Sequence, residues 1–322
     1  MGFSCSRWAR VLDGEARMTV FGANASERLA TVVFATDFSE ASENAGLYAS
    51  ALARRMQAGL VVMHAFFLEQ AAMEAETFRH LMSQQRIHLQ QELNKVAERL
   101  SSGRGATEAI LLERDPRIAV PELAMQRQPS IIVMGTHGGG AVERFVIGST
   151  AEGILRHTRL PALSVGPKTP PMQAETMNLK RVLFVTNNAA GATETAQLAI
   201  DVASSFGATL DVLNVIHPKS VENTLNELHE LYARHDETEA ALPSHSHDHV
   251  EIRTFVSVGQ PRTEILKHIR EREIDLLVMC LNSDTQLEMH GNLSGAFPII
   301  AEATCPVLTQ VTIAPSLPSN GI

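Results

Sequence analysis

The stretch TVVFATDFSEASENAGLYASALARRMQAGLVVMHAF (31–66) changes its hydrophobic pattern twice. It opens with a short run of β-branched and aromatic residues and closes with a second apolar run at 60–66, and both runs are typical of buried strands. Between them, apolar residues recur at the spacing of an amphipathic helix. Asp37 and Glu40 form a candidate capping box at its start, and Gly59 lies beyond its end. Two buried strands joined by a helix predict a parallel βαβ unit.

The same pattern returns later in the chain. RVLFVTN (181–187) has the form of TVVFATD (31–37), and LDVLNVI (210–216) has the form of LVVMHAF (60–66), both at an offset of 150 residues. Further on, Pro116 and Pro261 are separated by 145 residues, so the copies are collinear with five residues lost from the second. This period is too long for a solenoid repeat. The sequence therefore predicts an α/β protein of two tandem, doubly wound, Rossmann-like domains with parallel sheets.

The repeat divides the chain into five segments. They are an N-terminal extension (1–29), a first module (30–166), a Pro-rich polar linker (167–178), a second module (179–313) and a tail (314–322). We expect the extension to be disordered. Its start, MGFSCS, also fits an acylation pattern, and Met18 is an alternative first residue, so these interpretations stay open.

Composition limits the classes of function. The chain has 322 residues, a formal net charge of −9 and no clustered basic run, which argues against a nucleic-acid partner. Its three cysteines are widely spaced and form no C-x-x-C pair, so neither a disulfide framework nor a thiolate zinc site is expected. No run of 18 apolar residues suits a membrane span. We expect a cytoplasmic protein with no membrane partner.

The segment VMGTHGGGAVERFVIGST (133–150) carries five glycines directly after an apolar run. Ligands of open α/β sheets bind at the carboxyl ends of strands, where this segment begins. Glycines let backbone N–H groups approach an anion, and the segment 149–157 can present a helix N-terminus to it. The sequence therefore predicts a phosphate site here.

Three common motifs do not fit this segment. Ala141 stands where a P-loop requires Lys, and Glu143 stands where the dinucleotide fingerprint requires its third Gly. A hydrolytic triad of Asp37, His137 and Ser149 would rest on composition alone, because Ser149 is not in a G-x-S-x-G turn.

The spacing Gly135-x2-Gly138-x9-Gly148-Ser149 resembles the ATP-binding branch of the universal stress protein family. The resemblance extends over both modules, and it implies an ATP site in the first, with Asp37 near the ribose, the phosphates or their Mg²⁺ and with Ala65 at the adenine. His137 either approaches phosphate or only supports the loop. The residues implied in nucleotide binding are Thr36, Asp37, Ala65, Gly135, His137, Gly138, Gly148, Ser149 and Thr150.

The second module departs from this motif at most positions. Counterparts of the first-module residues are Asn187 for Asp37, Cys280 for Gly135, Ser283 for Gly138, Leu293 for Gly148 and Ser294 for Ser149. Side chains at former glycine positions should block a phosphate, so we expect a structural partner module without nucleotide. We expect the modules to pair through their last strands, 162–165 and 307–311, and the same edge offers a route to a homodimer.

Two features of the second module have alternative interpretations. His245, His247 and His249 form either a metal site or, as we favour, a solvated loop. Cys280 is either a reactive thiol or, as we favour, an inert buried one.

Three hypotheses for function follow. The first is a cytoplasmic stress-response protein that binds ATP as a sensing ligand, with an unidentified protein partner and at most slow ATP hydrolysis. The second is a protein-interaction module whose nucleotide site is vestigial. The third, an ATP-cleaving ligase, lacks the pyrophosphate loop expected near its first strand. We favour the first, because the glycine motif is intact.

Overall fold

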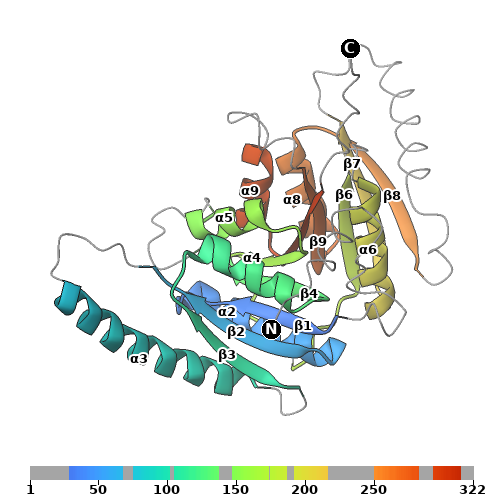
Figure 1. Ribbon diagram of the computed structural model, residues 1–322. Coiled ribbons are helices and arrows are strands. Elements are labelled where there is room, and N and C mark those ends of the chain that lie inside the picture. The colour runs from blue at the N-terminus through green and yellow to red at the C-terminus, as the bar shows by residue number, and fades with distance from the viewer. Residues whose placement is uncertain are drawn as a thin grey trace, which may run out of the picture.

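The computed structural model describes residues 29–67, 75–101, 105–137, 147–173, 175–186, 192–216, 250–282 and 293–312. Within these ranges, strands and helices alternate, and the ten strands form one sheet (Figure 1). Its order is β3-β2-β1-β4-β5-β10-β9-β6-β7-β8. Neighbouring strands are parallel except β5 and β10, which are antiparallel. The predicted α/β class with two doubly wound units is confirmed.

The first module supplies half of the sheet. Its elements are β1 (Thr31–Ala35), α2 (Glu40–Met56), β2 (Gly59–Ala65), α3 (Ala75–Leu100), β3 (Thr107–Leu112), α4 (Pro116–Gln126), β4 (Ser130–Gly135), α5 (Ser149–His157) and β5 (Ala162–Val165).

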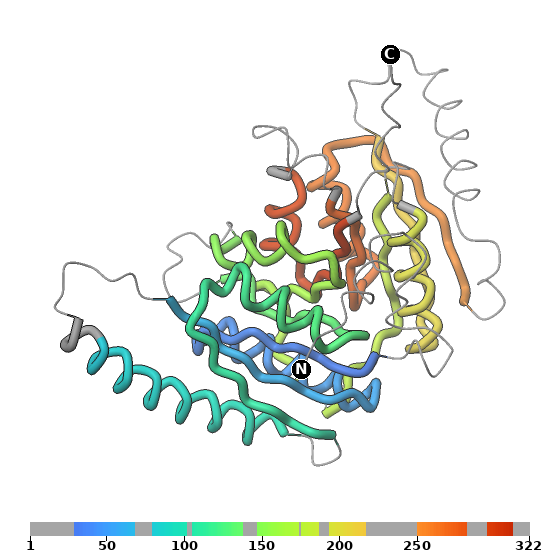
Figure 2. Tube along the Cα trace, in the orientation of Figure 1, coloured from blue at the N-terminus to red at the C-terminus, as the bar shows by residue number. Residues whose placement is uncertain are grey.

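The second module repeats this order, and the tube in Figure 2 follows the chain from one half into the other. Its described elements are β6 (Arg181–Thr186), α6 (Ala192–Phe206), β7 (Thr209–Ile216), β8 (Ile252–Val258), α8 (Pro261–Glu271), β9 (Leu276–Asn282), α9 (Leu293–Glu302) and β10 (Val307–Thr312).

The helix caps differ in part from the sequence-based expectation. Ser39, and not Asp37, is the N-cap of α2, and its side chain accepts a hydrogen bond from the Ser42 N–H. The predicted capping box was therefore displaced by two residues, because Asp37 binds Ser39 instead of the first helical turn. At the start of α4, Asp115 is the N-cap and Pro116 is the first helical residue, a position that favours proline.

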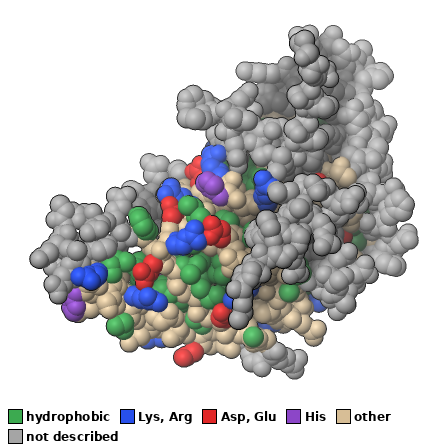
Figure 3. Space-filling view, viewed as in Figure 1, with side chains coloured by type: hydrophobic (Ala, Val, Ile, Leu, Met, Phe, Trp, Pro, Cys, Tyr) green, Lys and Arg blue, Asp and Glu red, His purple; other side chains and the backbone are tan. Residues whose placement is uncertain are grey.

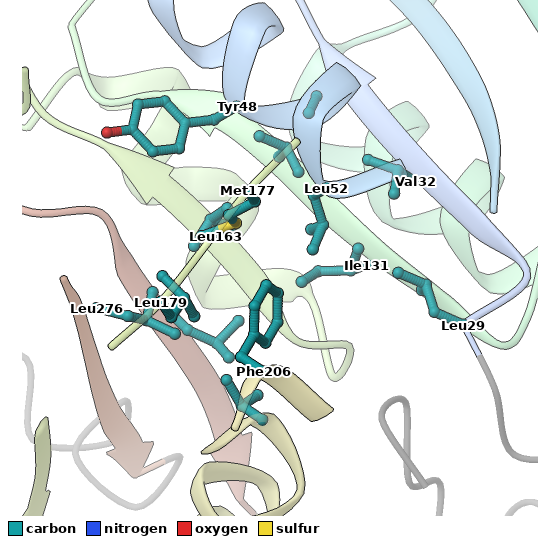
Figure 4. Close-up of a cluster of buried hydrophobic side chains, with 14 of the residues drawn as sticks. Leu29, Val32, Tyr48, Leu52, Ile131, Leu163, Met177, Leu179, Phe206 and Leu276 are labelled. Carbon is teal, nitrogen blue, oxygen red and sulfur yellow. The ribbon is translucent and has the colours of Figure 1, made fainter. Parts of the chain in front are cut away.

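Two helical layers cover the sheet. Alternate residues of β1 enter different cores, with Val32 and Phe34 on one face and Val33 on the other. The first face packs against α2, α3 and α6, and the second against α4, α5, α8 and α9. Figure 4 shows the first core passing between modules, where Leu52 and Leu163 of one lie near Leu179 and Phe206 of the other. Each core therefore spans both modules.

The modules meet at the antiparallel pair β5–β10. Leu163 lies opposite Leu308, and Ala162 lies opposite Thr309, whose hydroxyl donates to the Ala162 carbonyl. Because Leu163 and Leu308 are equivalent positions of the repeat, a local twofold axis passes through this pair. The predicted pairing of the last strands is confirmed.

The linker is held against helix α2. The Asn44 amide donates to the Thr169 carbonyl, and the Tyr48 hydroxyl donates to the Pro170 carbonyl. The Met177 N–H donates to the Ala51 carbonyl in α2. Burial is the main cause that raises the pKa of Tyr48 to about 12, so the phenol stays a donor at neutral pH. The linker therefore belongs to the packed structure of the first module.

The second module buries a charge that the sequence did not predict. Asp211 of β7 is 1% exposed, and its Oδ2 accepts from His268 Nε2 at 3.3 Å and from Arg272 Nε at 3.1 Å. Burial raises the pKa of Asp211, but hydrogen bonds from these partners outweigh it and hold the pKa below its usual value. The equivalent first-module residue is Val61, which is apolar and buried.

We expect Asp211→Asn to lower the free energy of unfolding by about 1–3 kcal/mol at pH 7, because it weakens two charge-assisted hydrogen bonds. Since the folded pKa is depressed, the stability from the carboxylate is present above about pH 4 and is lost as pH falls through the folded pKa. Urea unfolding at pH 7, 4 and 3 should show the variant and parent converging. A constant difference across this range would contradict the assignment.

At the seam, we expect Leu308→Ala to destabilise the chain by about 2–5 kcal/mol, because Leu308 is 1% exposed and truncation leaves a cavity between the modules. The control is Leu47→Ala on α2, whose side chain is 40% exposed and whose loss should change stability by less than about 0.5 kcal/mol. Urea unfolding measures both. Equal losses would show that the seam adds nothing beyond a surface contact.

Candidate functional site

A cavity of about 520 Å³ lies at the carboxyl ends of β1, β2 and β4. The first residues of α4 and α5 complete its wall. β1 is flanked by β2 on one side and β4 on the other, so the cavity is at the point where the strand order reverses. Open α/β sheets bind ligands at this point.

The cavity brings together eight of the nine residues implied by the sequence resemblance. Gly138 lies outside the described residues. The eight on the wall are Thr36, Asp37, Ala65, Gly135, His137, Gly148, Ser149 and Thr150.

The turn between β1 and α2 is held by Thr36. Its buried hydroxyl accepts from the Phe38 N–H at 3.0 Å and lies 2.6 Å from the Ser42 hydroxyl. Phe38 adopts φ +62°, a left-handed conformation that is costly for a residue of this size. Asp37 Oδ1 accepts from the backbone and the hydroxyl of Ser39, while Oδ2 has no hydrogen-bond partner among the described residues. The turn therefore presents one fixed carboxylate oxygen.

The N-terminus of α5 supplies donors without partners. Gly148 is the N-cap and offers no side chain, so no cap competes with a ligand. The N–H groups of Ser149, Thr150 and Ala151 have no hydrogen-bond acceptor within the described ranges. The Gly148 N–H, however, donates to the Thr136 carbonyl at 2.7 Å. The Gly148 N–H therefore already has an acceptor in this structure, and the unpartnered donors begin at Ser149.

Close packing against α2 favours glycine at position 135, which the sequence did not reveal. A Cβ atom at this position would lie 3.1 Å from the Ala41 carbonyl oxygen and 3.3 Å from the Ser42 nitrogen. These atoms belong to the first turn of α2, which crosses the end of β4. The side chain is therefore excluded by packing of the protein itself, in addition to any ligand.

His137 lies on the cavity wall, two residues after the end of β4. Its Nδ1 is 2.8 Å from the Thr136 hydroxyl. Burial lowers the pKa of His137 below its usual value, so the imidazole is neutral at pH 7. No Lys or Arg lies on the described part of the wall, so attraction of an anion there rests on backbone N–H groups.

Several residues of the cavity were missed by sequence analysis. They lie near the carboxyl ends of strands and on the adjoining helices, where most belong to an apolar pattern; only His64, next to Ala65, carried a visible signal. They are Ala35, Ser42, Met63, His64, Pro116, Val120, Met134, Thr136, Ala151 and Ile154. Most are apolar, which gives the cavity one dry side for a flat ring system.

The described residues form no cluster of three His, Cys, Asp or Glu side chains suited to a metal ion. Asp37 is the one carboxylate on the described wall. A cation here would need further ligands from a bound anion. The histidines at 245, 247 and 249, for which we favoured a solvated loop over a metal site, lie outside the described residues.

The family model described as the universal stress protein family matches residues 29–166 and 178–309. The chain belongs to the universal stress protein family. The resemblance stated from the glycine motif is thereby confirmed, and the two matches make it a tandem universal stress protein.

Comparisons with single proteins agree. A universal stress protein of Thermus aquaticus is 28% identical over 141 residues, which cover 42% of this chain and 97% of that protein. A universal stress protein from Archaeoglobus fulgidus shares the fold over 87% of this chain and 96% of its own, with 18% identity and a TM-score of 0.63. Another from the same organism was solved with dAMP, and it covers 42% of this chain and 99% of its own at 16% identity and a TM-score of 0.30.

In this universal stress protein, one cysteine of the second module stands in place of Gly135. Cys280 is partly exposed near the end of β9. The other described cysteine, Cys305, is buried in the core, and burial raises the pKa of Cys305 to about 12. The counterparts of Asp37 and Gly138, at 187 and 283, lie outside the described residues, so the loss of the second site stays a prediction.

The described surface shows paired charges of both signs (Figure 3). Examples are Arg114 with Glu122 and Arg127 with Glu108. Such exposed pairs contribute little to stability. No described helix of this universal stress protein is long and apolar enough to cross a membrane.

We expect Gly135→Ala to destabilise the protein by about 1–3 kcal/mol, because its methyl group would press on the first turn of α2. The matched control is Gly295→Ala in α9, where an added Cβ meets no atom within 4 Å. That substitution should stabilise the helix by about 0.5–1 kcal/mol. Thermal unfolding distinguishes the two, and stabilisation by both would show that α2 does not restrict position 135.

Proposed function

We propose that the first module binds one adenine nucleotide, ATP with Mg²⁺, as a regulatory ligand of a cytoplasmic stress-response protein. The observation that carries this proposal is one cavity that joins an apolar wall, unpartnered N–H donors of α5 and the carboxylate of Asp37. Apolar surface suits a base, and the helix N-terminus suits phosphate.

The phosphates belong at α5. The N–H groups of Ser149, Thr150 and Ala151, together with two side-chain hydroxyls, would donate hydrogen bonds to phosphate oxygens. The positive end of the helix dipole adds attraction for an anion. Gly148 leaves space beside these donors, since it has no side chain.

The adenine belongs at the apolar side of the cavity. Met63, Met134, Pro116 and Val120 supply that surface, and Ala65 ends β2 beside it. Asp37 lies between the two ends, at the carboxyl end of β1. Its unpartnered Oδ2 would bind Mg²⁺ or a ribose hydroxyl, and Mg²⁺ would offset phosphate charge where the described wall has no basic side chain.

A binding role suits the side chains better than a catalytic one. Asp37 is held by Ser39 through one oxygen, and His137 is bonded to its neighbour Thr136. The Thr136 hydroxyl is fully buried, and Asp37 has no third group among the described residues that would orient it as a catalytic base. We therefore propose that nucleotide occupancy is read by a protein partner, with the second module as structural support.

Calorimetric titration of the full chain with Mg-ATP should saturate near one equivalent, because one module keeps the glycine motif. A stoichiometry of two would show that the second module also binds nucleotide, in spite of Cys280, Ser283 and Leu293 at the former glycine positions. Absence of binding would favour an interaction module with a vestigial site.

Gly148→Leu should weaken ATP binding by more than about tenfold, because a branched side chain would occupy the space beside the α5 donors. The backbone at Gly148, φ −63° and ψ 144°, is open to any residue, so the fold should persist. Adenosine, which has no phosphate, is the matched control and should bind parent and variant alike. Equal ATP affinity in both would place the phosphates elsewhere.

A further inference from the structure

On the cavity wall, the protein fixes which ring nitrogen of His64 carries the proton. His64 Nδ1 lies 2.7 Å from the Thr36 carbonyl oxygen. A carbonyl oxygen only accepts, so Nδ1 carries the proton. In the neutral ring, Nε2 is then an acceptor.

The ring is also fixed in position. Phe38 lies against it with centroids 4.6 Å apart, and Phe66 is stacked nearly parallel at 6.2 Å and 11°. Phe38 reaches it from the left-handed turn that Thr36 stabilises. Rotation of the imidazole would therefore break its bond to the Thr36 carbonyl and its contact with Phe38.

The acceptor is available to a ligand. His64 lines the cavity, and Nε2 has no hydrogen-bond partner among the described residues. Nε2 is not among the buried atoms that lack a partner, so it is open to solvent. Burial of the ring lowers the pKa of His64, outweighing the Thr36 bond and the charge of Asp37, which raise it, so the acceptor state prevails at pH 7.

We propose that His64 Nε2 accepts a hydrogen bond from the nucleoside part of the ligand and so selects ligands that carry a donor at that point. This inference rests on the proposed nucleotide site. Phosphate is not the partner, because a phosphate oxygen is itself an acceptor and because β2, which carries His64, is two strand spacings, about 10 Å, from β4, which leads to α5. The donor is an O–H of the ribose or the exocyclic N–H₂ of the base.

Two substitutions distinguish recognition of the ligand by His64 Nε2 from support of the β1–α2 turn through Nδ1. His64→Asn places an amide N–H near the Nδ1 position, which keeps the bond to Thr36 but removes the acceptor. His64→Gln places an amide oxygen near Nε2 and loses the Thr36 bond. We expect the Asn variant to bind Mg-ATP about three- to tenfold more weakly and the Gln variant to retain more affinity. Thermal unfolding without nucleotide should rank them in the opposite order.

The donor is identified with ligand analogues on the parent chain and the Asn variant. 2′-Deoxy-ATP, 3′-deoxy-ATP and ITP each remove one candidate donor. The analogue that lacks the true donor should bind the parent chain as weakly as ATP binds the Asn variant. The Asn substitution should then cause no further loss of affinity for that analogue, as a double-mutant cycle requires. If the Asn variant weakens every analogue equally, His64 only supports the turn and the proposal is overturned.

A pH series gives a test that needs no substitution. The other titratable side chains on the described wall are Asp37 and His137. Protonation of Nε2 removes the acceptor, so adenosine affinity should be constant near pH 7 and fall as pH drops through the lowered pKa of His64. The Asn variant should lose this dependence. If the parent binds ATP tightly and substitution of His64 changes neither the affinity nor its pH dependence, this inference alone is refuted. If the parent does not bind ATP, the proposed function itself is refuted.

Discussion

The antiparallel pairing of β5 with β10 is the contact on which the architecture depends. Each module ends in a strand that is buried on both faces, and such a strand cannot be left at an exposed edge. By pairing Leu163 with Leu308 about a local twofold axis, the chain turns two half-sheets into one. Both hydrophobic cores then run without interruption under α2 and α6 on one face and under α5 and α9 on the other.

This arrangement leaves the carboxyl ends of the strands free in each half. In the first module, Thr36 organises that edge through its hydroxyl, which binds Phe38 and Ser42, and through its carbonyl, which binds His64. A single buried threonine thus connects the N-terminus of α2 to the end of β2. The strained turn at Phe38 is held by these bonds, and it fixes both Asp37 and His64 at the cavity.

The two modules share a topology but differ in side chains at equivalent positions. Gly135 lets α2 cross closely over β4, whereas the second module has Cys280 at the end of the equivalent strand. In contrast, the second module buries the carboxylate of Asp211 at the position of Val61.

The sequence by itself determined the order of strands and helices, the duplication, the pairing of the last strands and the position of the glycine motif at a strand end. The hydrophobic period is a local property and the repeat offset follows from comparing two segments, so both can be read from the letters alone. The tertiary structure alone decided why Gly135 excludes a side chain, that the Gly148 N–H is taken by Thr136, and that His64 lies on the wall with a fixed tautomer. These facts depend on atoms that come from distant parts of the chain, and only the strand order brings them within hydrogen-bonding distance.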